Sequence, residues 1–282
     1  MLFQKKIREL SLLLKFRKKN KVMKKIKVLY VDDERINLKA FTASFRRDFE
    51  IYTAISTEDA MLILKENPIE VLLCDQKMPG LSGVDFFESI LNRYPNPIRI
   101  LVTGYTDVNA IIGAINKGEV YRYINKPWDT FELRLTIKNA YGIYQLKEKN
   151  KILNLKYKKV FDSSADPILI LNQDNLVVDY NPVTLDLLEI KVDNLMNASF
   201  TSFFHKEEQA QGLKAMIDEK SKIKDYECVL RTQTGEKKIV LISGNMITNT
   251  YNELINYQLI IKDITERTKT NQLILKKIIE TQ

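Results

Sequence analysis

The sequence predicts a doubly wound α/β domain with a five-stranded parallel sheet, followed by an α+β domain with a five-stranded antiparallel sheet. In the first half, short apolar runs alternate with helical patterns, whereas the second half carries strand-like runs bounded by turn residues. The chain has 282 residues, more than one compact core usually fills, and its hydrophobic content of 45% supports globular cores.

The first half contains five candidate strands, at residues 27–31, 50–54, 71–74, 99–102 and 121–124. Between them, residues 34–45 and 56–67 repeat apolar side chains every three or four positions, which is typical of helices. Ser56, followed three residues later by Asp59, indicates the start of the second helix. This alternation predicts helices on both faces of a parallel sheet, whose ligands bind at the carboxyl ends of the strands.

Polar side chains follow the predicted strands at that edge. Asp32 and Asp33 follow the first strand, Asp75 the third, Thr103 the fourth and Lys126 the fifth. Three carboxylates at one edge repel one another, so they persist together only around a divalent cation, and oxygen ligands alone indicate Mg²⁺. One carboxylate can then act as a nucleophile toward a phosphoryl group, which makes Asp75 a predicted phosphoryl acceptor.

The segments "VDDE", "DQKMPGLSG", "LVTGY" and "INKPW" resemble the motifs of the receiver domains of bacterial two-component response regulators. The resemblance covers residues 26 to about 145 and implies a flavodoxin-like fold that is phosphorylated by a histidine kinase or a phosphotransfer protein. It implies that Asp33, Asp75 and the backbone carbonyl of Lys77 ligate Mg²⁺, with Asp32 acting through water.

The same resemblance implies roles for three further residues. Thr103 and Lys126 would hold the phosphoryl oxygens, and the Lys126–Pro127 peptide bond would be cis. Tyr123 matches the aromatic residue that rotates inward on activation, so Thr103 and Tyr123 form the expected switch pair.

Two side chains near the acceptor bear on the lifetime of the phosphorylated state. In receiver domains the positions two past the acceptor and two past the switch threonine border the path of the hydrolytic water, and here they hold Lys77 and Tyr105. A bulky phenol excludes water, and an ammonium does not orient it as a carboxylate or amide would. We therefore expect slow hydrolysis of the phosphoaspartate.

The second half resembles a PAS sensor domain from about Tyr157 to Arg267, through "FDSSADPILILNQDNLVVDYNP" and "KDITER". Five strand-like runs, with a helical stretch between the second and third, predict helices over one face of an antiparallel sheet. His205, the only histidine, lies where such domains often carry one in a turn, and the surroundings of Cys228 lack the motif for a flavin photoadduct. We assign no PAS cofactor, and expect dimerisation and relay first, with binding of a small ligand as the second possibility.

Charge is concentrated at the start of the chain. Residues 1–27 hold eleven Lys and Arg against Glu9, a net charge of +10, while the whole chain carries +8, so the rest carries −2. A nucleic-acid surface across the whole protein is therefore not expected. The leader is interpreted either as an amphipathic contact with a membrane or nucleic acid, or as a disordered tail or untranslated segment before Met23.

The sequence also bears on cellular location. It contains no predicted transmembrane segment. Its two cysteines, Cys74 and Cys228, lie in apolar runs and suit buried thiols of a reducing compartment. We expect a cytoplasmic protein.

The segment between the two domains carries a heptad pattern, formed by Ile143, Leu146, Asn150, Leu153, Tyr157 and Val160. One interpretation is a parallel two-stranded coiled coil in which Asn150 favours the dimer and fixes its register. The other is a single amphipathic helix packed on its own PAS domain. The former predicts a homodimer.

The predicted organisation is a basic leader (1–25), a receiver domain (26–145), a helical linker (146–156), a PAS domain (157–267) and a C-terminal helix (268–282). We expect a non-enzymatic signalling protein of a two-component phosphorelay, in which phosphorylation of Asp75 is passed to the PAS domain. The alternative is the sensory front of a larger enzyme, a hybrid histidine kinase or a cyclic-nucleotide enzyme. No phosphoacceptor histidine in a kinase setting and no glycine-rich phosphate-binding run lies within the chain.

Overall fold

A computed structural model of the chain describes residues 24–104 and 119–280. Nearly all of the predicted leader, residues 1–25, lies outside the described residues, as does Tyr105. The chain divides into two compact units, Met1–Ile152 and Leu153–Gln282. Among the described residues, no helix has both the length and the apolar character needed to cross a membrane.

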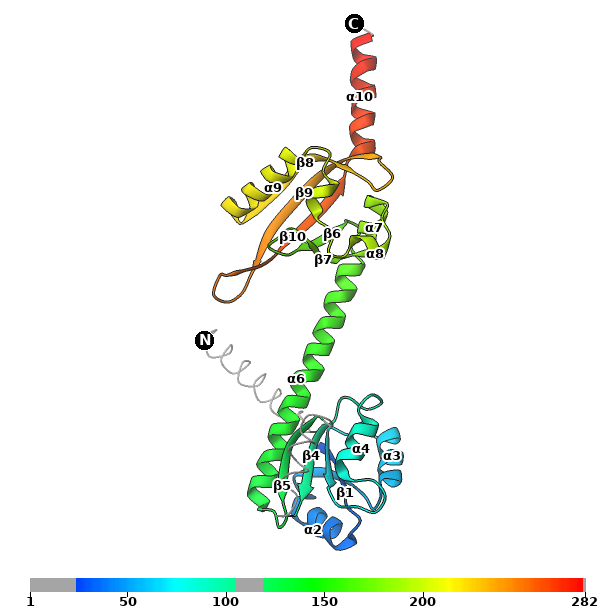
Figure 1. The fold of residues 1–282 in the computed structure, drawn as a ribbon, viewed down its shortest axis with the longest axis vertical. Helices are drawn as coiled ribbons and strands as arrows, with labels where there is room; N and C mark the ends of the chain where they lie inside the picture. The colour runs from blue at the N-terminus through cyan, green and yellow to red at the C-terminus, as the bar shows by residue number, and fades with distance from the viewer. Residues whose placement is uncertain (1–23, 105–118, 281–282) are drawn as a thin grey trace, which may run out of the picture. The chain divides into compact units, whose positions relative to one another are not determined.

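The first unit is built on a five-stranded parallel sheet, which confirms the predicted fold class (Figure 1). Its strands are β1 (Ile26–Val31), β2 (Phe49–Ala54), β3 (Val71–Asp75), β4 (Ile98–Thr103) and β5 (Val120–Asn125). They lie in the order β2-β1-β3-β4-β5, and each neighbouring pair is parallel. The strand order therefore reverses between β1 and β3, which is where open α/β sheets bind their ligands.

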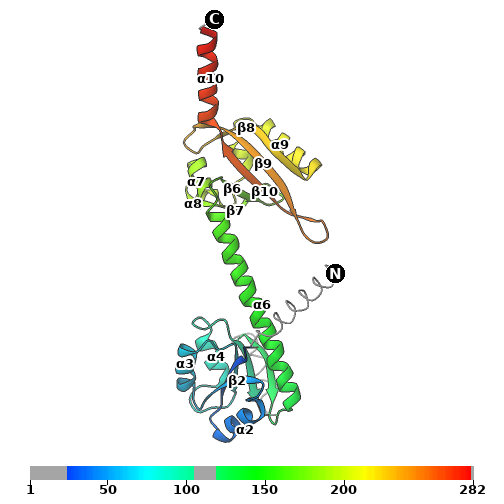
Figure 2. The same cartoon turned by 180° about the vertical axis from the view of Figure 1, so that it is seen from behind.

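Helices cover both faces of this sheet (Figures 1 and 2). Alternate residues of β1 point to opposite faces. Val28 and Tyr30 belong to the core that contains residues of α2 (Arg35–Phe45) and α6 (Thr130–Asp162). Leu29 and Val31 belong to the core that contains residues of α3 (Thr57–Glu66) and α4 (Gly83–Ile90). Since both faces are covered, β3 and β4 are buried along their whole length.

Two of these helices begin at serine caps. The hydroxyl of Ser56 accepts a hydrogen bond of 3.2 Å from the backbone N–H of Asp59, as the sequence predicts for the start of α3. Ser82 accepts an equivalent bond of 3.2 Å from Asp85 at the start of α4. Each cap satisfies a backbone donor that the first helical turn leaves unpaired.

The second unit contains the predicted five-stranded antiparallel sheet. Its strands are β6 (Ile168–Leu171), β7 (Val177–Tyr180), β8 (Lys222–Arg231), β9 (Lys237–Thr248) and β10 (Leu254–Asp263), in the order β7-β6-β10-β9-β8. Between β7 and β8 lie α7 (Pro182–Leu188), α8 (Val192–Leu195), the 3₁₀-helix η1 (Phe200–Phe203) and α9 (Glu207–Lys220). The last described element is α10 (Thr265–Glu280).

Both faces of the second sheet take part in packing. On one face, α9 lies so close to β9 that a Cβ atom at Gly244 would come within 2.8 Å of the Ile217 side chain. On the other face, Phe161 in the last turn of α6 packs with Ile168 and Ile170. The sequence predicts helices over one face, so the contact made by Phe161 is an addition to that prediction.

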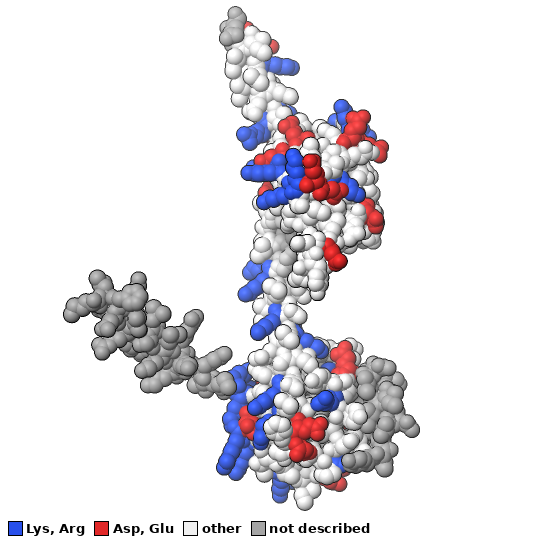
Figure 3. All heavy atoms as spheres, turned by 90° about the vertical axis from the view of Figure 1, so that its left-hand side faces the viewer, with Lys and Arg blue, Asp and Glu red and all other residues white. Residues whose placement is uncertain are grey.

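The surface of the second unit is mixed in charge. In the view of Figure 3, Lys and Arg side chains are interspersed with Asp and Glu over this unit, while Lys and Arg gather along one edge of the first unit. Interspersed charges of both signs are typical of a solvent-exposed surface.

Candidate functional site

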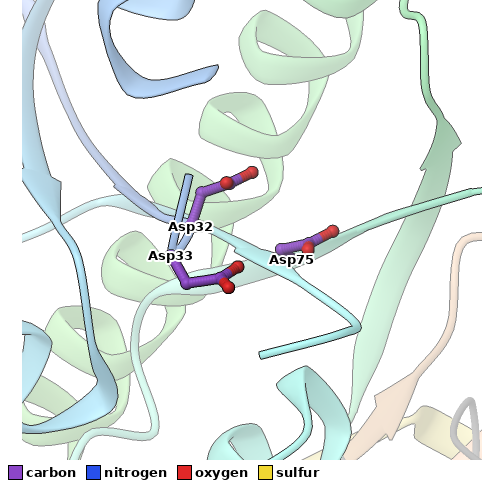
Figure 4. A group of neighbouring side chains, drawn as sticks. All are labelled: Asp32, Asp33 and Asp75. Carbon is purple, nitrogen blue, oxygen red and sulfur yellow. The ribbon is translucent and has the colours of Figure 1, made fainter. Parts of the chain in front are cut away.

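Three aspartates meet at the carboxyl edge of the parallel sheet. Asp32 and Asp33 follow β1, and Asp75 is the last residue of β3, the neighbour of β1. One carboxylate oxygen from each side chain lies within 4.8 Å of the other two, and Figure 4 shows the three side chains extending the same way from the two strand ends. The structure thus brings together the three carboxylates that the sequence predicts as metal ligands.

Asp32 is fully buried and accepts hydrogen bonds from several donors. Its Oδ1 accepts from the backbone N–H of Glu34 and from Nδ2 of Asn37, both at 3.0 Å. Its Oδ2 accepts from Nζ of Lys126 at 2.8 Å and from the hydroxyl of Tyr30. A buried carboxylate is costly without such partners, and this network fixes the orientation of Asp32.

Lys126 joins two of the aspartates. Its Nζ lies 2.8 Å from Oδ1 of Asp75 as well as 2.8 Å from Oδ2 of Asp32. Burial lowers the pKa of Lys126, but its hydrogen bonds to the two carboxylates outweigh this effect, so that its pKa is raised overall. The ammonium group therefore remains charged and offsets part of the negative charge of the site.

Asp75 is 6% exposed, and its surroundings shift its pKa in opposite directions. Burial is the largest of them and raises the pKa of Asp75, Lys126 acts in the lowering direction, and the charges of Asp32 and Asp33 raise it further. The net result is a pKa above the ordinary value of an aspartate. A second cation beside Asp75 would favour the charged form of this carboxylate.

The loop after β3 passes close to the acceptor strand. Gly80 adopts a φ of 86°, a left-handed conformation that favours glycine. A Cβ atom at Gly83 would lie 2.4 Å from the carbonyl oxygen of Asp75, so no larger residue fits there without a shift of the backbone. These glycines hold the loop that carries Lys77 against the strand that carries Asp75.

Thr103 and Tyr123 occupy different positions in this structure. Thr103 ends β4 and is 1% exposed, and its hydroxyl donates to the carbonyl of Gly104 at 3.1 Å. Tyr123 lies in β5 with 45% of its surface exposed. The structure therefore brings Thr103 to the sheet edge that carries the aspartates and leaves Tyr123 exposed to solvent.

Sequence reasoning missed two residues of the network, Tyr30 and Asn37. Asn37 lies in the first turn of α2, where its side chain reaches back to both oxygens of Asp32, at 3.0 and 3.2 Å. Tyr30 precedes Asp32 by two positions in β1, so both side chains point to the same side of the strand. A tyrosine in a mostly aliphatic strand, two residues before an aspartate, was the available signal.

The two PAS-region residues considered for cofactors lie in ordinary surroundings. Nδ1 of His205 is 2.9 Å from a guanidinium nitrogen of Arg231, and the positive charge of nearby Lys237 is the main cause that lowers the pKa of this histidine. Cys228 is buried in the core of the second unit, where burial raises the pKa of its thiol to about 12.

Two family models match the chain. The model described as response regulator receiver domain matches residues 28–138, and the PAS domain model matches residues 165–266. The first match contains every residue of the acidic site, and the second contains the five strands β6 to β10.

Curated proteins and a solved structure are similar to part of the chain. The hydrogenase transcriptional regulatory protein HoxA of Cupriavidus necator is 39% identical over 117 residues, which are 42% of this chain and 24% of the relative. A putative NtrX-like response regulator of Rickettsia felis is 30% identical over 141 residues, which are 49% of this chain and 29% of the relative. A solved response regulator receiver domain protein from Clostridium thermocellum is 33% identical, with a TM-score of 0.41, and the match covers 43% of this chain and 98% of that one.

The chain spans less than a third of the length of these two curated relatives. The two family matches identify the parts of the chain: a response regulator receiver domain at residues 28–138, followed by a PAS domain at residues 165–266.

Proposed function

We propose that this protein receives a phosphoryl group on Asp75 within a two-component phosphorelay and passes the signal through α6 to its PAS domain. The observation that carries the proposal is the position of Asp75 at the strand-order reversal, 2.8 Å from Lys126 and beside two further carboxylates. Phosphoryl transfer to a side chain requires a carboxylate nucleophile next to a fixed cation and a group of ligands that can hold a metal ion.

The acidic cluster fits Mg²⁺. Three carboxylate oxygens within 4.8 Å of one another form an all-oxygen donor set with an excess of negative charge, as Mg²⁺ prefers. Asp33, Asp75 and the carbonyl of Lys77 would bind the ion directly, and Asp32 would bind it through water. When bound, Mg²⁺ neutralises charge on the transferred phosphoryl oxygens.

The residues of the chain carry out the transfer. An oxygen of Asp75 attacks the phosphorus in line with the bond to the donor nitrogen, the P–N bond breaks, and its electron pair leaves with the donor imidazole. An acyl phosphate is thereby formed on Asp75. Lys126 moves from pairing with the carboxylate to pairing with a phosphoryl oxygen, and the hydroxyl of Thr103 donates to another.

This change is the basis of the switch. Thr103 donates to the carbonyl of Gly104 in this structure and would turn toward the phosphoryl group once it is present. The space that it leaves is filled by Tyr123, which is now 45% exposed. Inward movement of Tyr123 alters the exposed surface around β5.

We further propose that α6 forms a homodimer contact. Leu146, Leu153 and Val160 lie on its predicted heptad seam and are 61%, 64% and 72% exposed. Apolar side chains this exposed on a continuous helix gain stability by packing against an identical helix. Tyr157 is also on the seam, and its hydroxyl lies 3.3 Å from Asp179 of the PAS domain, which would connect the seam to that domain.

The donor is expected to be a histidine kinase or a phosphotransfer protein in the cytoplasm. The chain is proposed to act without further catalysis, since phosphoryl transfer to Asp75 and hydrolysis of the product account for its site.

The test is reaction of the full chain with acetyl phosphate and Mg²⁺, followed by peptide mapping of the acyl phosphate. We expect the modification on the peptide that carries Asp75 and on no other. A modification that maps elsewhere, or that forms equally well in excess chelator, would contradict the proposal.

A further inference from the structure

Tyr30 occupies a central place in the acidic site although it is not itself an acid. It is fully buried in β1, and its hydroxyl donates to Oδ2 of Asp32, the same oxygen that Lys126 contacts at 2.8 Å. Removal of the hydroxyl would leave this oxygen of the fully buried Asp32 with fewer donors. The orientation of Asp32 therefore depends on Tyr30 as well as on Lys126.

The ring of Tyr30 makes a second kind of contact. Its centroid lies 5.9 Å from that of Trp128, with the rings at 89° in an edge-to-face arrangement, and 4.8 Å from that of Phe41 in α2. Edge-to-face aromatic pairs have a preferred geometry, so movement of one ring is felt by the other. Tyr30 thus touches Asp32 through its hydroxyl and Trp128 through its ring.

Trp128 lies close to the start of α6. It follows the Lys126–Pro127 pair and precedes the first residue of α6, Thr130, by two positions. Its side chain is partly buried against the core shared by α2 and α6. A displacement of Trp128 is therefore applied at the first turn of the helix that continues to the PAS domain.

We propose that Tyr30 is a positioning residue of the metal site, which holds Asp32 in the orientation that Mg²⁺ requires and transmits the movement of Asp32 on metal binding to Trp128. The inference rests on the proposed function, since it requires that the acidic cluster binds Mg²⁺. Groups that orient the residues around a metal commonly affect its affinity nearly as much as the ligands do. Close packing of the rings leaves little free space to absorb a shift of the hydroxyl.

Tyr30→Phe isolates the hydroxyl, because the phenylalanine ring retains the contacts with Phe41 and Trp128. Tyr52→Phe provides a matched control. The hydroxyl of Tyr52 donates to Oε1 of Glu50 at 2.6 Å, which is again a bond between a tyrosine and a carboxylate two residues away on one strand. This second pair lies in β2 and is exposed, away from the aspartate cluster.

The experiment is a titration of the full chain with Mg²⁺. Binding is measured by calorimetry and by the fluorescence of Trp128, the only tryptophan. Mg²⁺ is expected to change the fluorescence of the wild-type protein. Tyr30→Phe should raise the Kd for Mg²⁺ about tenfold, at the lower end of the effects known for groups that orient metal ligands, because Asp32 retains other donors. It should also lose most of the fluorescence change at saturating Mg²⁺, while Tyr52→Phe behaves as wild type.

The experiment distinguishes failure of the metal site from failure of the role of Tyr30. If calorimetry detects no binding of Mg²⁺ to wild type, the metal site assumed in the proposed function is wrong, and the positioning role of Tyr30 is wrong as well. If wild type binds Mg²⁺ with no change in Trp128 fluorescence, the proposed coupling between the metal site and Trp128 is wrong. The wild-type protein alone is enough to show this. If Tyr30→Phe has the Kd and the fluorescence change of wild type, the positioning role is overturned while the metal site stands.

Discussion

Nζ of Lys126 lies 2.8 Å from Oδ1 of Asp75, so the predicted phosphoryl acceptor is already paired with the cation that is expected to follow the phosphoryl group. The same ammonium contacts Asp32, which means that one lysine offsets the charge of two buried carboxylates. Loss of Lys126 would therefore affect the resting site and the phosphorylated site alike.

We predict that Lys126→Ala reduces both the rate of phosphorylation by acetyl phosphate and the response to it. Thr103→Ala should still be phosphorylated but should fail to respond, because the Thr103 hydroxyl donates to the carbonyl of Gly104 in the described part of the chain and is expected to report the added phosphoryl group. Phosphorylation is measured as acyl phosphate per chain. The response is measured as protection of Tyr123 from chemical nitration, resolved from the other tyrosines by peptide mass spectrometry.

Thr136→Ala serves as a control, since Thr136 is a buried threonine of α6 whose hydroxyl accepts a hydrogen bond of 3.5 Å from Arg122. It should be phosphorylated and protected as wild type. If phosphorylated Thr103→Ala protects Tyr123 as fully as wild type does, the coupling between Thr103 and Tyr123 is wrong.

A second prediction concerns stability in the absence of metal. Burial raises the pKa of Asp75, and a carboxyl group whose pKa is higher in the folded than in the unfolded chain stabilises the fold only when protonated. That contribution is fully present below the unfolded pKa, about 3.9, and is lost as the pH rises through the folded pKa. At neutral pH in a chelator, Asp75→Asn should therefore unfold at a higher temperature than wild type.

The difference in melting temperature should narrow as the pH falls toward the ordinary pKa of an aspartate, because Asp75 becomes protonated in the wild type. Saturating Mg²⁺ at neutral pH should narrow it as well, since the cation favours the charged carboxylate. Thermal unfolding of both proteins across this pH range checks the prediction. A lower melting temperature for Asp75→Asn at neutral pH in chelator would show that the pair with Lys126 outweighs the cost of burying the charge.

Much of the fold follows from patterns along the chain. The strands that end near Asp32 and Asp75 are runs of apolar residues too short for helices, and the cap at Ser56 is a local hydrogen bond that the sequence displays directly. The order of the strands in the second sheet was not predicted, because β6 pairs with β10 across a long stretch of chain and no local signal encodes that pairing.

The site was predictable to the extent that it lies at strand ends. A parallel sheet places residues after consecutive strands at one edge, so the meeting of Asp32, Asp75 and Lys126 follows from topology. The contact between Tyr30 and Trp128 does not, because it depends on how the β5–α6 connection folds back over the sheet. The position of Tyr30 in a core strand gives little indication of the group to which its hydroxyl donates.

A third prediction tests the homodimer contact. Leu153 and Leu155 are neighbours on α6 with 64% and 63% exposure, but only Leu153 lies on the predicted heptad seam. Leu153→Asp should shift the protein toward monomer in analytical ultracentrifugation, because a charge would be buried at the seam, whereas Leu155→Asp should not. Equal effects of the two substitutions would contradict the seam, and a wild-type protein that is monomeric would contradict the dimer itself.

The lifetime of the phosphoaspartate remains a prediction based on Lys77 and Tyr105, of which Tyr105 lies outside the described residues. We expect decay about tenfold or more slower than in a fast chemotaxis-type receiver, which corresponds to roughly 1.4 kcal/mol of additional barrier. The combined substitution of Lys77→Asn and Tyr105→Glu should accelerate decay, measured after removal of the donor at saturating Mg²⁺. A double variant that decays no faster than wild type would show that these side chains do not control access of water.

Labelling of the full chain with acetyl phosphate that carries radioactive phosphorus, in the presence of Mg²⁺, tests whether Asp75 is the phosphoryl acceptor. Asp85, an exposed aspartate in the first turn of α4, provides the matched control. We predict that wild type and Asp85→Asn acquire the label, that Asp75→Asn does not, and that a chelator prevents labelling of wild type and Asp85→Asn. Magnesium-dependent labelling of Asp75→Asn to the level of wild type would contradict the assignment.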